Sequence, residues 1–260
     1  MARPRIGQGV VVDVPATTAN LGPGFDCLGA ALDLNNRFEM RCIEGGGERF
    51  ELVIEGSEGS HLRGGPDNLV YRAAQRVWKE AGEEPIAIEA RVRLAVPPAR
   101  GLGSSATAIV AGLMGANALI GEKLSREKLL ELAIDIEGHP DNVVPSLLGG
   151  LCMTARAASH RWRVVRCEWD PKVMVVVAIP AIRLSTSEAR RVMPKAISIP
   201  DAVTNLGSSP SWWARIWRSR PPYRSCSRSI CCWRLALRAA SSCSTAASVA
   251  KSYRPLPPQS

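Results

Sequence analysis

The last 53 residues of this sequence contain no aspartate or glutamate, and this absence changes what the composition means. The chain has 260 residues, with 33 Lys and Arg against 24 Asp and Glu, for a formal net charge of +9. All of that excess lies in residues 208–260, which carry eight Arg and one Lys, whereas residues 1–207 are neutral overall. The basic average therefore gives no reason to treat the body of the chain as a nucleic-acid binder.

Metal-binding cysteine pairs and long apolar runs are also missing. The eight cysteines form no C-x-x-C pair; four are scattered through the body and four crowd residues 226–243. No run approaches the ~18–20 apolar residues of a membrane span, and residues 1–14 lack the apolar core of a signal peptide. We therefore expect a cytoplasmic protein with reduced thiols and no membrane partner.

Apolar residues make up 46% of the chain and follow both helical and strand periods. The alternation predicts strands over residues 8–14, 36–43, 50–55, 86–96, 151–155, 162–167 and 173–179, the last of them fully buried. The 3.6-residue period and capping residues predict helices over residues 68–81, 103–120, 125–137 and 140–149 and a helical turn over 188–192. Strands, then a helical block, then strands again predict an α+β fold in two lobes.

The stretch VPPARGLGSSATAIVAG, residues 96–112, places prolines and glycines between a predicted strand and a small-residue helix. Such a loop presents backbone N–H groups at the positive end of a helix dipole, which favours a phosphate. The Walker A pattern fails because no Lys-Ser/Thr follows the glycines. The dinucleotide fingerprint fits Gly101, Gly103 and Ala106 formally, but a second helix follows instead of a parallel strand. A tight turn at a close-packed helix start is the alternative.

Three further stretches concentrate polar groups. In PATTANLGPGFDCLGAAL (15–32), Asn20 and Asp26 flank a Gly-Pro-Gly turn, and IDIEGHPDNVVPSLLGG (134–150) groups a Glu, a His, an Asp and an Asn. Polar turns and helix caps are the simpler interpretation of both. In PAIRLSTSEARRVMPK (180–195), Thr186 and Arg190 share one face of a short helix. A planar guanidinium suits a carboxylate, although a capped surface helix is the alternative and fits Arg191.

These motifs resemble those of the GHMP small-molecule kinases, which include galactokinase, mevalonate kinase and homoserine kinase. P-x-x-x-G-L-G-S-S-A is similar to the ATP motif of the family, and A-N-L-G-x-G-F-D and E-G-H-P-D-N-V-x-P are similar to homoserine kinase motifs. The resemblance covers residues 8–207. It implies a two-lobed α+β GHMP kinase fold with a ribosomal S5 domain 2-like N-terminal lobe (1–155) and the start of a ferredoxin-like C-terminal lobe (156–207) that is incomplete.

By this resemblance the chain phosphorylates the hydroxyl of L-homoserine with ATP, a step of threonine biosynthesis. The implied ATP-binding residues are Pro97, Arg100, Gly101, Leu102, Gly103, Ser104, Ser105, Ala106 and Thr107. The implied L-homoserine-binding residues are Asn20, Asp26, His139, Asn142, Thr186 and Arg190. Ser105 and Glu137 are implied as the catalytic pair and as Mg²⁺ ligands, with Asp26 for the ammonium and Arg190 for the carboxylate. Asp141 is the nearest general-base candidate, and the resemblance requires no general base.

The alternative function is another GHMP kinase, or an inactive remnant with a basic tail. Whether the chain forms a homodimer is left open.

Residues 208–260 depart from the family, and three interpretations compete for them. A nucleic-acid arm would use the positive charges and Trp212, Trp213, Trp217 and Trp233. A disordered basic tail is the second interpretation. Out-of-frame translation of a GC-rich gene is the third. We favour the third, because Arg outnumbers Lys eight to one and acids vanish where the resemblance ends. Nucleic acid is thus not an expected partner. A lobe broken there would expose apolar surface, so we expect poor solubility or inactivity.

Overall fold

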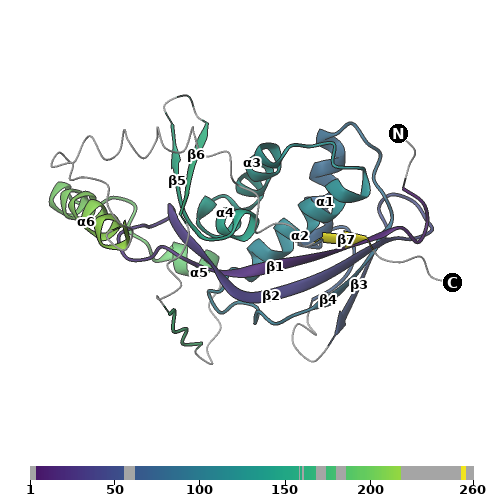
Figure 1. Ribbon diagram of the computed structural model, residues 1–260, viewed down its shortest axis with the longest axis horizontal. Coiled ribbons are helices and arrows are strands. Elements are labelled where there is room, and N and C mark those ends of the chain that lie inside the picture. Colours follow the sequence, from purple (N-terminus) through teal and green to yellow (C-terminus); the bar gives the residue numbers. More distant parts are fainter. Residues whose placement is uncertain are drawn as a thin grey trace.

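The computed structural model describes residues 4–55, 62–157, 159, 161–167, 174–179, 186–217 and 253–255. The strands are β1 (Gly9–Ala19), β2 (Leu28–Cys42), β3 (Phe50–Glu55), β4 (Ile88–Arg93), β5 (Leu151–Arg156), β6 (Trp162–Cys167) and β7 (Tyr253–Pro255). The helices are α1 (Leu69–Glu80), α2 (Ser104–Leu119), α3 (Arg126–Glu137), α4 (Pro140–Leu148), α5 (Thr186–Arg191) and α6 (Ile199–Trp217). Helices α1 to α4 lie together on one face of a mixed sheet (Figure 1).

The sheet is built on a long antiparallel pair, β1 and β2, whose register runs from Gly9↔Arg41 to Ala19↔Gly29. The strand order is β3-β4-β2-β1-β7, and β5 joins β2 at Leu28–Ala30 and carries β6 on its other side. Strands β3 and β4 run parallel, and the other pairs are antiparallel. Helix-covered sheets with mixed strand directions are typical of α+β folds, as the sequence predicted.

Small residues explain how α2 packs centrally between α1 and the sheet. A Cβ at Gly112 would lie 2.2 Å from the carbonyl oxygen of Val70 in α1, and one at Gly115 would lie 2.2 Å from the sulfur of Met40 in β2. Glycine and alanine therefore let both neighbours approach the helix axis closely. Because α2 is surrounded by protein, its apolar residues cover all sides and not a single stripe.

Helix ends position the polar residues. The Ser125 hydroxyl accepts a hydrogen bond from Lys128 N at 3.2 Å and caps the start of α3. Gly138 ends α3 in the left-handed region, with φ of 87°. The chain then enters α4 directly at Pro140, a residue suited to the first helical position. This tight connection keeps Glu137 and His139 together at the junction of two helices.

The predicted helices over 68–81, 103–120, 125–137 and 140–149 are confirmed within a few residues. Five of the strand predictions are also confirmed in their central residues, and the strand over 86–96 is shorter, Ile88–Arg93. The buried strand predicted over 173–179 is wrong. Residues 174–179 form no strand, and Met174 and Val176 are 88% and 92% exposed. An apolar strand is buried only between partners, and no described residue pairs with this segment.

Helix α6 was not predicted, and it runs without interruption past Gly207 to Trp217. Val203 and Leu206 on it are 62% and 72% exposed. Beyond Cys167, the described residues contribute α5, α6 and β7, and β7 joins the same sheet as β1. Residues 218–252 and 256–260, on which most of the tail interpretations depend, lie outside the described residues. None of the described helices combines the length and apolarity needed to cross a bilayer.

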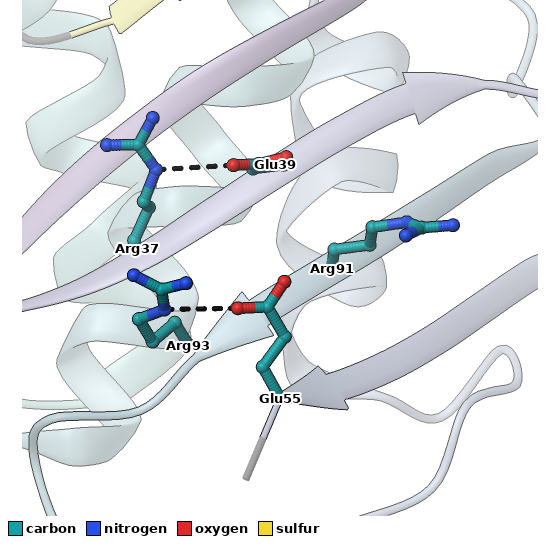
Figure 2. A pocket seen from close by; sticks show the side chains of 5 residues that line it. All are labelled: Arg37, Glu39, Glu55, Arg91 and Arg93. Carbon is teal, nitrogen blue, oxygen red and sulfur yellow. Dashed lines mark hydrogen bonds and ion pairs between the residues drawn. The ribbon is translucent and has the colours of Figure 1, made fainter.

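The sheet face opposite the helices is covered by charged side chains. A shallow hollow of about 230 Å³ there is lined by Arg37, Glu39, Glu55, Arg91 and Arg93 (Figure 2). Arg37 pairs with Glu39 at 3.3 Å and Arg93 with Glu55 at 3.0 Å. These exposed ion pairs balance one another, as expected for a solvated face, and each contributes little to stability.

One buried amide connects the sheet to the loop before α2. Asn36 on β2 is fully buried, and its Oδ1 accepts hydrogen bonds from the backbone N–H groups of Ala95 and Val96 at 2.9 and 2.8 Å. Its Nδ2 donates to the hydroxyl of Thr107 in the first turn of α2 at 2.9 Å. The start of α2 is therefore fixed relative to the end of β4 by one side chain.

Replacing this amide should destabilise the whole lobe. Asn36→Leu leaves the N–H groups of Ala95 and Val96 without this acceptor, and the Val96 group is buried. The free energy of unfolding should fall by about 1–3 kcal/mol. Urea unfolding followed by circular dichroism measures the change. The control is Asn35→Ala, because Asn35 is the exposed neighbour on the same strand and its replacement should stay within about 0.5 kcal/mol. Equal effects at the two positions would contradict the role of the Asn36 amide.

Candidate active site

The loop between β1 and β2 is held in a strained but well-bonded conformation. Asn20 and Asp26 both have positive φ, 70° and 56°, which costs non-glycine residues energy unless local bonds compensate. The Asn20 side-chain oxygen accepts from Asp26 N at 3.1 Å, and Asn20 N donates to Leu28 O at 2.7 Å, closing the loop at its base. Thr154 N on β5 donates to Cys27 O at 2.8 Å. The loop therefore presents Phe25 and Asp26 at its tip from a fixed base.

The glycine loop before α2 also uses left-handed backbone. Ala99, Gly101 and Gly103 have φ of 57°, 73° and 66°. Helix α2 begins at Ser104 without a side-chain cap, so its first N–H groups face the loop at the positive end of the helix dipole. Such an arrangement suits an anion. Leu102 and Thr107 point inward: both are buried, and Leu102 packs with Ala16 and Val96.

At Gly103 the glycine loop comes close to both β1 and α4. A Cβ there would lie 2.0 Å from the hydroxyl oxygen of Thr17 and 3.1 Å from Oδ1 of Asn142. The Thr17 hydroxyl donates to that Asn142 oxygen at 2.8 Å, and Thr17 N donates to Leu102 O at 3.1 Å. The glycine loop therefore rests on β1 and the start of α4, and only glycine fits at this position.

Ser105 in the first turn of α2 meets Glu137, the last residue of α3. The Ser105 hydroxyl donates to Glu137 Oε1 at 2.8 Å. Ser105 is exposed, whereas the Glu137 side chain is only 10% exposed. The structure thus brings together a hydroxyl and a carboxylate that are 32 positions apart in the sequence. Both are hard oxygen donors of the kind that Mg²⁺ binds.

His139 lies next to this pair and is oriented by Asp141. The distance from His139 Nδ1 to Asp141 Oδ1 is 2.6 Å, and His139 Nε2 is 3.9 Å from Glu137 Oε1. The hydrogen bond to Asp141 raises the pKa of His139 above its ordinary value of 6.5, against the opposing effect of burial. Asn142 Nδ2 also donates to Asp141 Oδ1 at 3.3 Å. Asp141 is thus bonded to two neighbours, which makes it a poor candidate for a free base.

Arg190 reaches this region from α5. Its Nη1 donates to Asp26 Oδ2 at 3.1 Å and its Nη2 bonds to Asp26 Oδ1, forming a bidentate ion pair. Its guanidinium carbon lies 5.5 Å from the centre of the Phe25 ring. The pairing with Asp26 raises the pKa of Arg190. Two residues expected to bind opposite ends of one ligand therefore contact each other.

The structure places most of the residues singled out from the sequence at two adjoining loops and the α3–α4 junction. Thr186 is an exception: it is exposed at the start of α5, and no hydrogen-bond partner is recorded for it among the described residues. Asp26, His139 and Asp141 offer ligand atoms within 4.8 Å of one another. Arg190 already holds Asp26 there, and His139 holds Asp141.

Sequence reasoning missed the residues that support the site. Thr17, Asn36 and Phe25 were not predicted to have a role. Thr17 lies within the PATTANLGPGFD stretch, so its position was a signal that could have found it. Asn36 lies in β2 between Asn35 and Arg37, at a buried position of the strand. A buried amide is generally satisfied by several bonds.

Known proteins resemble this chain in both sequence and fold. A sequence model described as the GHMP kinases N-terminal domain matches residues 68–150. The crystal structure of homoserine kinase from Cytophaga hutchinsonii superposes with a TM-score of 0.68 and 28% identity, covering 84% of this chain and 70% of that one. A structure assigned as a homoserine kinase from Listeria monocytogenes has a TM-score of 0.61 and 31% identity, with coverage of 81% and 69%. The chain belongs to the homoserine kinase family.

The α+β GHMP kinase fold predicted from the sequence is therefore confirmed. Among curated relatives, the homoserine kinase of Synechococcus sp. strain CC9605 is 88% identical over 208 residues. That match covers 80% of this chain and 66% of the relative, so the chain spans slightly less than two thirds of the length of this family member.

The geometry around His139 predicts a specific pH behaviour. Because its pKa is raised in the folded state, His139 should titrate above 6.5 in proton NMR of the imidazole signals. Its contribution to stability should be fully present below pH 6.5 and should be lost as pH rises through the folded pKa. The stability difference between wild type and His139→Gln should shrink over that same pH range.

The Asp141→Asn variant provides the control, because it removes the carboxylate and keeps the shape. The titration midpoint of His139 should then fall towards or below 6.5. A wild-type midpoint at or below 6.5, or a midpoint unmoved by Asp141→Asn, would contradict the assigned hydrogen bond.

Proposed function

We propose that the chain is an ATP-dependent kinase that phosphorylates the hydroxyl of L-homoserine to O-phospho-L-homoserine, a step towards threonine. The observation that carries the proposal is the position of the Asp26–Arg190 ion pair. It sets a carboxylate and a guanidinium beside the α3–α4 junction that holds Glu137 and His139. An α-amino acid carries the complementary ammonium and carboxylate. Mevalonate and sugars lack the ammonium, so this pair favours homoserine.

ATP would bind at the glycine loop. The backbone N–H groups at the start of α2 and the left-handed Gly101 and Gly103 would cradle its phosphates. Pro97, Arg100 and Ser104 complete the proposed surface, and the buried residues Leu102, Ala106 and Thr107 support it from below. Gly103 packs directly on Thr17 and Asn142. A shift of the glycine loop would therefore also move Asn142, which is a proposed substrate-binding residue.

Ser105 and Glu137 fit a Mg²⁺ ion. Their oxygens lie 2.8 Å apart, one on a hydroxyl and one on a largely buried carboxylate. When bound, Mg²⁺ would neutralise charge on the phosphates of ATP. Glu137 supplies the negative charge that would hold the ion, and Ser105 keeps that carboxylate turned towards the glycine loop.

L-Homoserine would bind between the β1–β2 loop and α5. We propose that Asp26 accepts the ammonium and that Arg190 binds the carboxylate, with Asn20, His139 and Asn142 along the path to the phosphates and Thr186 at the start of α5. Phosphoryl transfer depends mainly on positioning and charge stabilisation. The substrate proton needs no dedicated base in this proposal, which agrees with Asp141 being committed to His139.

The activity is tested by measuring ADP release with L-homoserine, mevalonate and galactose as acceptors. Homoserine should be the preferred acceptor and turnover should require Mg²⁺. Arg190→Ala should raise the KM for homoserine about tenfold to a hundredfold, as expected for loss of charged hydrogen bonds. Glu137→Ala should lower kcat by about 100-fold or more. The matched control is Arg191→Ala, which removes the exposed neighbour and should change neither constant. Preference for another acceptor, or an unaltered KM in Arg190→Ala, would contradict the proposal.

We further propose that residues 1–155 form the ATP-binding domain, that residues 156–207 begin the second domain, and that residues 208–260 are not kinase sequence. Relatives match over 208 residues, close to the point where acidic residues disappear. Exposed apolar residues of α6 support a second domain that lacks its usual cover, such as Ile199 at 80% and Leu206 at 72% exposed. Out-of-frame translation accounts for the composition of the tail.

The tail proposal makes a prediction about the gene and the protein. A one-base shift in the DNA near codon 207 should restore a frame that encodes acidic residues. A chimera with the C-terminal part of the Synechococcus CC9605 relative in place of residues 208–260 should be more active towards homoserine than the full chain. Equal activity of the two would contradict the tail proposal. Inactivity of both would contradict the kinase proposal.

A further inference from the structure

Phe25 is an exposed aromatic residue whose position the rest of the site does not explain. It is 50% exposed at the tip of the β1–β2 loop, next to Asp26. Burial of apolar surface therefore accounts for little of its placement. Its ring lies under the guanidinium of Arg190, with 5.5 Å between Cζ and the ring centre. A guanidinium at this distance from an aromatic face is attracted by the ring quadrupole.

The ion pair with Asp26 uses only one edge of the guanidinium. Nη1 and Nη2 each bond to one oxygen of Asp26, so the carboxylate sits end-on. Among the described residues, no hydrogen bond is recorded for Nε of Arg190. The edge formed by Nε and one Nη can thus still bind a second carboxylate with two parallel hydrogen bonds. Each Asp26 oxygen likewise retains a lone pair for an ammonium.

This geometry lets a ligand join the pair without breaking it. An α-amino acid placed beside the pair would complete a ring of four alternating charges. The ammonium of the ligand would lie next to Asp26, and the carboxylate of the ligand would lie next to Arg190. The direction of the open guanidinium edge then decides whether the carboxylate is reached. Asp26 fixes the position of the guanidinium. The flat ring of Phe25 beneath it restrains rotation of the guanidinium about its hydrogen bonds to Asp26.

We propose that Phe25 is a positioning residue that holds the guanidinium of Arg190 flat and turned so that its open edge meets the carboxylate of an α-amino acid. It acts through Arg190 and does not touch the reacting atoms. The inference rests on the proposed function for the identity of the ligand, and on the structure alone for the contact with Arg190. The loop itself is suited to this role, because Asn20 and Thr154 fix its backbone at the base and below the tip.

The contact is tested without any enzymatic activity by measuring the rate at which phenylglyoxal modifies Arg190. The full-length chain is treated, digested and analysed by mass spectrometry. Phe25→Leu keeps an apolar side chain and removes the aromatic face, and should raise the rate at Arg190 about two- to fivefold. Phe25→Tyr and Phe25→Trp keep the face and should stay close to wild type. Arg191 is the internal control, since it is exposed on the same helix and should react at one rate in all variants.

These outcomes separate positioning from unfolding. An Arg190 rate unchanged in Phe25→Leu overturns the proposal, and so does an equal rise in the Leu, Tyr and Trp variants. If Phe25→Leu unfolds the chain, Arg166 will also react faster, because its Nε donates to the carbonyl oxygens of Leu148 and Gly149 only in the folded state. The Tyr and Trp variants then decide. They must hold Arg190 at the wild-type rate while Asp26→Asn, which removes the ion pair, raises it.

A calorimetric titration links the contact to the ligand. L-Homoserine should bind Phe25→Leu about two- to fivefold more weakly than wild type, and 3-aminopropan-1-ol, which lacks the carboxylate, should bind both equally. ATP affinity should not change. If wild type binds no homoserine, the proposed function fails, but the phenylglyoxal rates still decide whether Phe25 positions Arg190. If homoserine binds both proteins equally, the positioning proposal fails and the proposed function stands.

Discussion

The close approach of Gly103 to Thr17 and Asn142 is the constraint on which the site depends. A Cβ added to Gly103 would lie 2.0 Å from the Thr17 hydroxyl and would disturb its hydrogen bond to Asn142, and the positive φ of 66° also favours glycine. The glycine loop is therefore held at a fixed distance from the β1–β2 pair and from the α3–α4 junction. This spacing brings Ser105 to Glu137, and the same α3–α4 junction places His139 beside Glu137. Ala99, Asn20 and Asp26 keep strained backbone conformations because the surrounding contacts fix the backbone in place.

Sequence patterns identified the elements of the first lobe well because each element satisfies a local rule. Ser125 caps a helix, and alternation marks β4. The same patterns failed where burial depends on distant partners. The apolar run over 174–179 looks like an inner strand, but it is exposed because no described neighbour covers it. Helix α6 was missed because its glycine, prolines and serines argue against a helix locally.

Motifs located the candidate site more reliably than they explained its contacts. Loops that are far apart in sequence were expected to bind one ligand, and the structure does bring them together. The pairing of Asp26 with Arg190 could not be predicted, because it joins residues 164 positions apart and depends on how α5 lies against the β1–β2 loop. Nor could the role of Phe25 be foreseen, since a single aromatic residue in a loop has no periodicity to interpret.

The pairing of β7 with β1 has a consequence for folding. Val10–Val12 and Tyr253–Pro255 lie near opposite ends of the sequence, and three facing residues join them. Closing so long a loop costs more entropy than closing the β1–β2 hairpin, and few contacts compensate for it. The β7 strand should therefore add last during folding and open first in native fluctuations. Each opening would uncover the outer N–H and C=O groups of β1, a row able to pair with another chain.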